Sequence, residues 1–106
     1  MVEMDQIRQL SDLIAKEFNA RRIILFGSYA SDMPSADSDV DILVILPFEG
    51  KSTWKSLEIL NRIKPGFPVD LLARTPQQVE QRLEWNDFFM REIIEKGKVL
   101  YEADNA

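Results

Sequence analysis

Hydrophobic residues change from helical to strand spacing along the chain, and each change predicts a new element. In residues 4–18 the apolar side chains recur every three or four positions, which is typical of a helix with one buried face. The members of this stripe are Met4, Ile7, Leu10, Leu13, Ile14 and Phe18. A β-branched and aliphatic run follows at residues 22–26, and Gly27 ends it, so we expect a strand there.

The next apolar run, residues 39–46, has the period of two that is typical of a strand, and Pro47 ends it. One face of this strand carries Val40, Ile42, Val44 and Leu46, and the other carries Asp39, Asp41, Leu43 and Ile45. The strand therefore begins polar and becomes apolar on both faces, as a central strand does. Before it, residues 28–30 predict one helical turn capped by Ser28, and residues 31–38 predict a loop.

The second half of the chain repeats this alternation of helix and strand. The expected elements are a helix over residues 54–63 ended by Pro65-Gly66, a strand at 67–72, a helix that opens at Thr75-Pro76, a helix at 85–96 ended by Gly97, and a short strand at 99–101. For Trp85, Phe88 and Phe89 we favour a place in the core over an interface. The order predicts an α/β (α+β) fold, a small mixed β-sheet with helices packed mainly on one face.

Length and composition narrow the classes of function. With 106 residues, the chain is expected to form a single domain over residues 1–106. Its formal net charge of -5 argues against direct nucleic-acid binding, which needs clustered Lys and Arg. The absence of Cys and His excludes disulfides, Cys/His zinc sites and histidine-activated nucleophiles, so a metal would be held by oxygen. No signal-peptide pattern or membrane-length apolar run is present, and we expect a soluble, cytoplasmic protein without a membrane partner.

Three aspartates lie within otherwise apolar strands, where aspartate is disfavoured. Asp39 and Asp41 are two positions apart, so both side chains project to one face, with Cα atoms roughly 7 Å apart. Asp70 lies in the apolar run 69–72 and completes a triad if that strand neighbours the strand that begins at Asp39. An Asp-x-Asp pair alone is more often solvated surface, but three such residues predict a site for divalent cations of the kind used in phosphoryl transfer.

Asp37-x-Asp39-x-Asp41 also resembles the opening of a calcium-binding loop. That loop requires Gly at its sixth position and Glu at its twelfth, where this chain has Ile42 and Phe48. The calcium loop is therefore excluded, and we assign Asp37 to the turn before the strand.

Gly27-Ser28 fits a turn that holds phosphate at the end of a strand. Glycine lets a phosphate approach the backbone, and serine supplies a hydroxyl and an N–H group. Alone, the pair is typical of many turns that end a strand. Its weight comes from the ten residues that separate it from Asp39.

Together, Gly27-Ser28, the spaced Asp39-x-Asp41 and the later Asp70 resemble the signature of the DNA-polymerase-beta-like nucleotidyltransferases. The chain is most similar to the minimal nucleotidyltransferases of prokaryotes. These are small single domains, often the antitoxin half of a pair with a helical HEPN ribonuclease toxin. The similarity covers most of the chain and implies the polymerase-beta-like fold.

The resemblance implies a role for each residue of the motif. Gly27 and Ser28 would hold the β- and γ-phosphates of a nucleoside triphosphate. Asp39 and Asp41 would bind two Mg²⁺ ions, with Mn²⁺ as an alternative. Asp70 would bind the metal nearer the acceptor and help to activate the acceptor hydroxyl. The chemistry would be in-line attack on the α-phosphorus, with pyrophosphate as the leaving group.

One segment departs from the family pattern. Many active relatives have Ala-Arg-Gly after the Gly-Ser pair, where this chain has Ala30-Ser31-Asp32. The missing arginine is one that could pair with phosphate. Arg22 or Arg74 are candidates to replace it.

Two functions remain open from the sequence. The first is a magnesium-dependent enzyme that transfers a nucleoside monophosphate, expected to be AMP from ATP, to a hydroxyl on a HEPN-type partner protein. The second is an acidic antitoxin with a weak or inactive site that neutralises a partner by direct contact. The nucleotide, the acceptor, the partner and assembly into a homo-oligomer all stay open.

Overall fold

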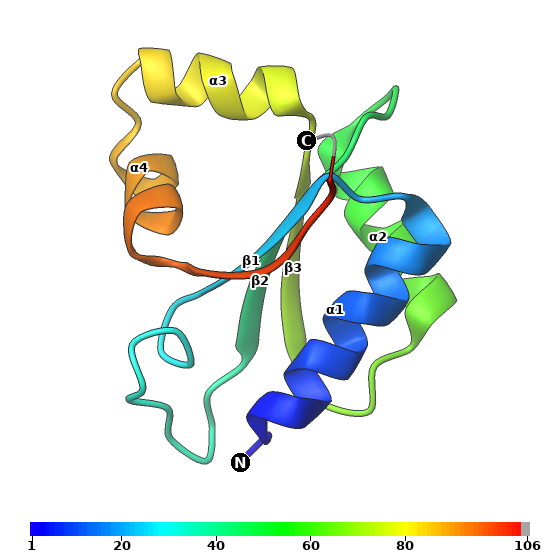
Figure 1. Cartoon of the computed structure of the whole chain (residues 1–106), viewed down its shortest axis with the longest axis vertical. Helices are drawn as coiled ribbons and strands as arrows, with labels where there is room; N and C mark the ends of the chain where they lie inside the picture. The colour runs from blue at the N-terminus through cyan, green and yellow to red at the C-terminus, as the bar shows by residue number, and fades with distance from the viewer. Residues whose placement is uncertain (105–106) are drawn as a thin grey trace.

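The computed structural model describes residues 1–104 (Figure 1). The elements in chain order are α1 (Met4–Phe18), β1 (Arg22–Phe26), β2 (Val40–Ile45), α2 (Ser52–Ile63), β3 (Val69–Arg74), α3 (Pro76–Glu84), α4 (Phe88–Lys96) and β4 (Lys98–Glu102). Every helix and strand expected from the sequence is present, apart from the single helical turn predicted at residues 28–30. Within the described residues, no helix combines the length and the apolar character that crossing a membrane requires.

The strands form one mixed sheet in the order β3-β2-β1-β4. β1 pairs antiparallel with β2 and with β4, whereas β2 and β3 are parallel and joined through α2. A parallel pair needs such a crossover, because its strands cannot be linked by a tight turn. This sheet confirms the predicted α/β fold with a small mixed sheet.

The layering of the helices differs from the expectation that they pack mainly on one face. α1 and α2 cover one face of the sheet, and α3 and α4 cover the other (Figure 1). The reason is the second apolar face of β2, where Leu43 and Ile45 are buried. Val79 of α3 and Met90 and Ile93 of α4 supply the cover that these side chains need to leave water.

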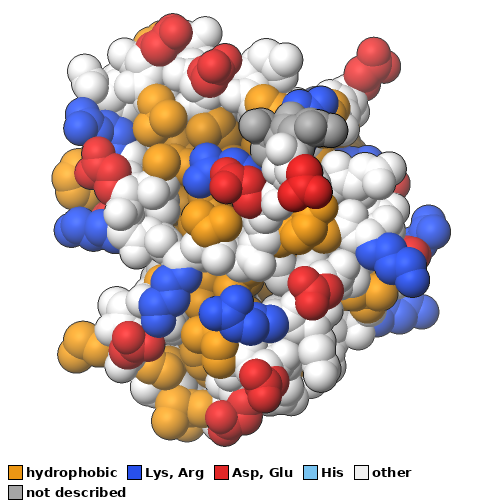
Figure 2. Space-filling view, viewed as in Figure 1, with side chains coloured by type: hydrophobic (Ala, Val, Ile, Leu, Met, Phe, Trp, Pro, Cys, Tyr) orange, Lys and Arg blue, Asp and Glu red, His pale blue; other side chains and the backbone are white. Residues whose placement is uncertain are grey.

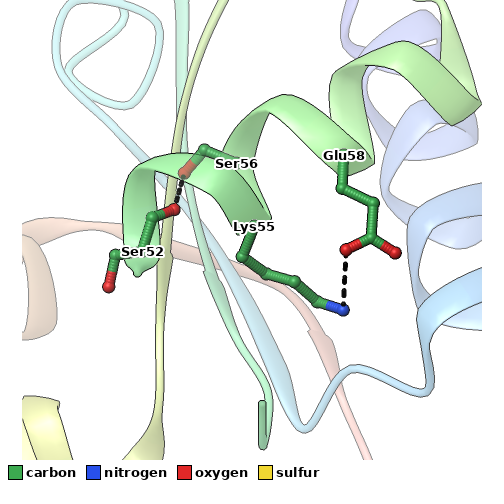
Figure 3. Close-up of polar contacts among 4 residues, drawn as sticks. All are labelled: Ser52, Lys55, Ser56 and Glu58. Atoms are coloured by element: carbon green, nitrogen blue, oxygen red, sulfur yellow. Dashed lines mark hydrogen bonds and ion pairs between the residues drawn. The ribbon is translucent and has the colours of Figure 1, made fainter. Parts of the chain in front are cut away.

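The larger core lies between the sheet and the helices α1 and α2. Its buried members include Ile7, Leu10 and Ile14 of α1, Ile23 and Leu25 of β1, Val40, Ile42 and Val44 of β2, and Ile59 of α2. A polar contact also joins α2 to the sheet: the Ser56 hydroxyl donates to the Ser52 carbonyl at 2.9 Å (Figure 3) and accepts the Ala73 N–H at 3.1 Å. Because β3 is an edge strand, this bond satisfies a backbone donor that has no strand partner.

The observed ends of several helices and strands differ by a few residues from the ends predicted from the sequence. β3 begins at Val69 and not at residue 67, because the strand follows the pairing with β2. Thr75 caps α3 as expected, since its hydroxyl accepts the Gln78 N–H. α4 begins after Asp87, whose carboxylate accepts the Met90 N–H at 2.9 Å, so residues 85–87 form a break between two helices.

Candidate functional site

The three aspartates predicted to form a site lie together at one end of the sheet. Asp41 and Asp70 are direct register partners on the parallel strands β2 and β3, and Phe26 of β1 is the partner of Asp41 on the other side. Side chains of register partners project to the same face. Asp39 stands two positions before Asp41, just before β2 begins. All three carboxylates belong to the face that α3 and α4 cover at its other end.

Electrostatics show that these carboxylates influence one another. Asp41 is half-buried, whereas Asp39 and Asp70 are exposed. Burial raises the pKa of Asp41 above its ordinary value, and the negative charges of Asp70 and then Asp39 raise it further. An added positive charge at this end of the sheet would relieve that repulsion.

The donor set fits a hard divalent cation by its chemistry, because all three side chains offer oxygen. Within residues 1–104, however, no group of three or more His, Cys, Asp or Glu side chains is arranged to hold a metal ion. The exposed side chains of Asp39 and Asp70 would have to turn toward Asp41 for one ion to be shared. Their exposure leaves them free to do so.

Gly27 is required where it stands for two reasons. Its φ of +75° lies in the left-handed region that side chains disfavour. A Cβ atom at this position would also overlap the Asp41 carboxylate. The turn thus brings bare backbone directly against the carboxylate of Asp41, and any side chain at position 27 would displace that carboxylate.

The segment after Gly27 is a hydrogen-bonded turn and not the helical turn capped by Ser28 that we expected. The Gly27 carbonyl accepts the N–H groups of Ala30 and Ser31 at 3.1 and 3.2 Å. Asp32 then adopts φ of +58°, which interrupts a right-handed helix. The Ser28 carbonyl accepts a hydrogen bond from the Ser31 hydroxyl at 3.1 Å, so Ser28 supports the turn through its backbone oxygen.

A cavity of about 400 Å³ opens beside this turn. Its lining is formed by Phe26, Gly27, Ala30, Ser31, Asp41, Phe89, Glu92, Ile93 and Lys96. The surface in Figure 2 is hollowed at its left edge, between α4 and the loop that follows β1. Of the predicted site residues, Gly27 and Asp41 line the cavity. Asp39 and Asp70 adjoin it through Asp41, and Ser31 rather than Ser28 is the serine in the lining.

α4 is the wall that sequence reasoning missed. The spacing of residues 85–96 was assigned to the core, and Ile93 does pack there, but Phe89, Glu92 and Lys96 face the cavity. Phe89 contacts Phe26 edge-to-face with ring centroids 5.7 Å apart. One residue of the sequence, Gly97, could have indicated that α4 lies close to the sheet, but it was interpreted only as the end of a helix.

Gly97 lets the end of α4 approach β1 closely. A Cβ atom there would lie 2.5 Å from Ile24 Cγ2 and 2.9 Å from the Leu25 carbonyl oxygen. Such distances are shorter than real Cβ contacts, so any larger residue would push α4 away from the strand. Gly97 therefore holds the end of α4 against Ile24 and Leu25, in the strand that leads to the Gly27 turn.

The two arginines proposed to replace the missing one are both far from the turn. Arg22 and Arg74 are each register partners of Ile45, four positions along β2 from Asp41. At about 3.3 Å per residue this separation is about 13 Å. The expectation that either arginine takes this place is therefore wrong. Asp32, which stands in the departing segment, pairs instead with Lys98 at 2.9 Å.

Trp85, at the end of α3, and Phe88 and Phe89, at the start of α4, are on the surface, contrary to the place in the core that we favoured. The exposed fractions are 67% for Trp85, 80% for Phe88 and 53% for Phe89. On α4, Phe88 and Phe89 lie outside the buried stripe, which contains Met90 and Ile93.

Comparison with known proteins gives both a family and relatives. The model of the family described as "Polymerase beta, Nucleotidyltransferase" matches residues 8–106. A protein of Methanocaldococcus jannaschii named "Putative protein adenylyltransferase" is 26% identical over 105 residues, which are 95% of this chain and 100% of that protein.

Solved structures show the same fold at low identity. A crystal structure of a "putative nucleotidyltransferase" from Sulfolobus solfataricus has a TM-score of 0.67 and 14% identity, over 96% of this chain and 82% of that chain. A toxin-antitoxin structure with AMP-PNP has a TM-score of 0.58 and 18% identity, over 92% and 75%. A mutant of the toxin-antitoxin MntA-HpeT has a TM-score of 0.57 and 16% identity, over 92% and 75%.

Proposed function

The chain belongs to the polymerase beta nucleotidyltransferase family, an enzyme family, and we propose that it transfers AMP from ATP to a hydroxyl group of a protein. The observation that carries this proposal is the row of Asp39, Asp41 and Asp70 beside the Gly27 turn. The name of the Methanocaldococcus relative, a protein adenylyltransferase, supports both the adenylyl group and a protein acceptor. The similar toxin-antitoxin structure with AMP-PNP supports an adenine nucleotide.

In this proposal the chain positions the triphosphate and the acceptor. The turn at Gly27 and Ser28 holds the β- and γ-phosphates through backbone N–H groups and hydroxyls. The acceptor oxygen attacks the α-phosphorus and forms a new P–O bond, while the bond from that phosphorus to the oxygen bridging the β-phosphate breaks. Pyrophosphate leaves with the electron pair of that bond. Asp70 orients the acceptor hydroxyl, whose proton passes to water.

Asp39, Asp41 and Asp70 would hold two Mg²⁺ ions, with Mn²⁺ as an alternative. Bound there, the ions would neutralise the negative charge of the triphosphate and of the departing pyrophosphate. Burial, and after it the negative charges of Asp70 and Asp39, raise the pKa of Asp41. The charge part of this effect supports the role, because a bound cation would replace repulsion with attraction.

The partner we propose is a HEPN-type toxin whose hydroxyl receives AMP. Support comes from the toxin-antitoxin structures with the same fold. A second function, neutralisation of that partner by contact alone, has its own observation: Trp85 and Phe88 are 67% and 80% exposed. Large exposed aromatic side chains are enriched at protein interfaces.

Mass spectrometry of the partner tests the proposal. The partner, expressed from the gene adjacent to that of this chain, would be incubated with the chain, ATP and Mg²⁺. We expect the mass of the partner to increase by one AMP. Asp39→Ala should abolish the gain, while the control Asp37→Ala should retain it, because Asp37 is an exposed loop residue outside the row. A partner that stays unmodified but is bound and silenced equally by the wild type and Asp39→Ala would leave only neutralisation by contact.

A further inference from the structure

We propose that Lys96, at the end of α4, binds the phosphates of the nucleoside triphosphate in place of the arginine that the turn lacks. This inference rests on the proposed nucleotidyl transfer and adds a residue to that site. It starts from the segment Ala30-Ser31-Asp32, which borders the cavity without offering a basic side chain.

Lys96 is the one basic side chain among the described residues that line the cavity. Gly27, Ala30 and Ser31 line it from the turn after β1, and Lys96 lines it from the facing helix. The close contact of Gly97 with Ile24 and Leu25 fixes the end of α4 at this level of the sheet. A phosphate at the Gly27 turn therefore lies across the cavity from the Lys96 ammonium group.

Other cations at this end of the sheet are engaged or distant. Lys98 pairs with Asp32 at 2.9 Å, and Arg22 pairs with Glu102 at the opposite end of β1. Within residues 1–104, none of the ion pairs involves Lys96. Lys96 is an exposed residue, so its side chain is accessible to a ligand.

The charge around the cavity favours a cation at this position. Asp41 and Glu92 line it, and the carbonyl groups at the end of α4 add partial negative charge. A triphosphate entering this space meets repulsion from each of them. Lysine is a flexible point charge with three donors, so it can follow phosphate oxygens that occupy more than one position.

Calorimetric titration with ATP and Mg²⁺ tests the inference on Lys96→Met. We expect ATP to bind about 10- to 100-fold more weakly, which corresponds to about 1.4 kcal/mol per factor of ten. The loss should be smaller for AMP, which lacks the β- and γ-phosphates, and Lys96→Arg should restore most of the affinity. Lys16→Met is the matched control, because Lys16 lies in the last turn of α1 on the other face of the sheet.

The outcomes separate the inference from the function on which it rests. Lys96→Met with wild-type affinity for ATP, or with a loss no larger than that of Lys16→Met, overturns the role of Lys96 and leaves nucleotidyl transfer standing. An equal loss for ATP and AMP overturns it too, because the contact would then not be to the terminal phosphates. A wild-type chain that binds no nucleoside triphosphate overturns the proposed function and the inference with it. Thermal melting of each variant confirms that the fold is intact.

Discussion

The two faces of the sheet are built by the same strands but differ in how far their apolar character extends. Under α1 and α2, β2 contributes Val40, Ile42 and Val44, and the face is buried along the whole strand. Under α3 and α4, the same strand contributes Leu43 and Ile45, but its first residue on that side is Asp41. The first face therefore contributes apolar burial along the whole strand, whereas the second face has charged side chains where part of an apolar core could be.

The difference shows how a small domain can accommodate repulsive charge. The larger core contains fifteen buried residues and the smaller one six, so the first face carries most of the burial that stabilises the fold. α4 covers the sheet only as far as the Phe26–Phe89 contact. Phe26 is the register partner of the half-buried Asp41, and the neighbouring Asp39 and Asp70 are exposed, so the repulsion among the three carboxylates is partly screened.

The largest expected effect breaks the apolar face. Ile42→Ala should lower the free energy of unfolding by about 2–5 kcal/mol, because Ile42 is fully enclosed and its truncation leaves a cavity. Urea unfolding measures this loss. Asp39→Ala, at an exposed position on the other face, should change the free energy of unfolding by no more than about 0.5 kcal/mol. A loss at Asp39 as large as that at Ile42 would contradict the division between the faces.

A smaller effect tests the contact that closes the second face. Gly97→Ala should lower the free energy of unfolding by about 1–3 kcal/mol, because its Cβ atom would meet Ile24 and the Leu25 backbone. Gly66→Ala is the control: an added Cβ there has no neighbour within 4 Å, so stability should hold or rise slightly. Equal melting temperatures for the two variants would mean that α4 does not need this close approach.

The contrast between the faces also explains what could be predicted from the sequence. Alternation along residues 39–46 assigned every side chain of β2 to its face, because a strand has a strict period of two. The strand Arg22–Phe26 and the helix Met4–Phe18 were predicted with their observed ends. We predicted that Asp70 would complete the triad if its strand neighboured the strand of Asp41. The pairing of β2 with β3 meets that condition.

Relations across the fold escaped the sequence analysis. The apolar stripe of α4 is the same whichever face it covers, so the two-sided layering could not be predicted. The spacing of apolar residues in α4 also does not show which side chains beside the buried stripe face a cavity. Phe89 and Lys96 were missed for this reason. Arg22 and Arg74 were offered as phosphate ligands because sequence distance gave no register. Pairing with Ile45 places both at the wrong end of the sheet.

The smallest predicted effect sharpens the comparison at a single carboxylate. In metal-free buffer at about pH 7, Asp41→Asn should raise the free energy of unfolding by about 0.5 kcal/mol, because it removes a charge that is partly buried and repelled by Asp70 and Asp39, although solvent partly screens it.

The pH dependence of stability tests the same prediction. The raised pKa means that folded Asp41 holds its proton more tightly than unfolded Asp41 does. Wild-type stability therefore falls as the pH rises through the interval between the two pKa values. Asparagine does not ionise, so the advantage of the variant should be complete above this interval and absent below it, at about pH 3. Urea unfolding at both pH values, with Asp37→Asn as the control outside the row, measures the effect. A variant less stable than the wild type at both pH values would contradict this prediction. It would show that the Asp41 carboxylate stabilises the Gly27 turn and does not destabilise the fold.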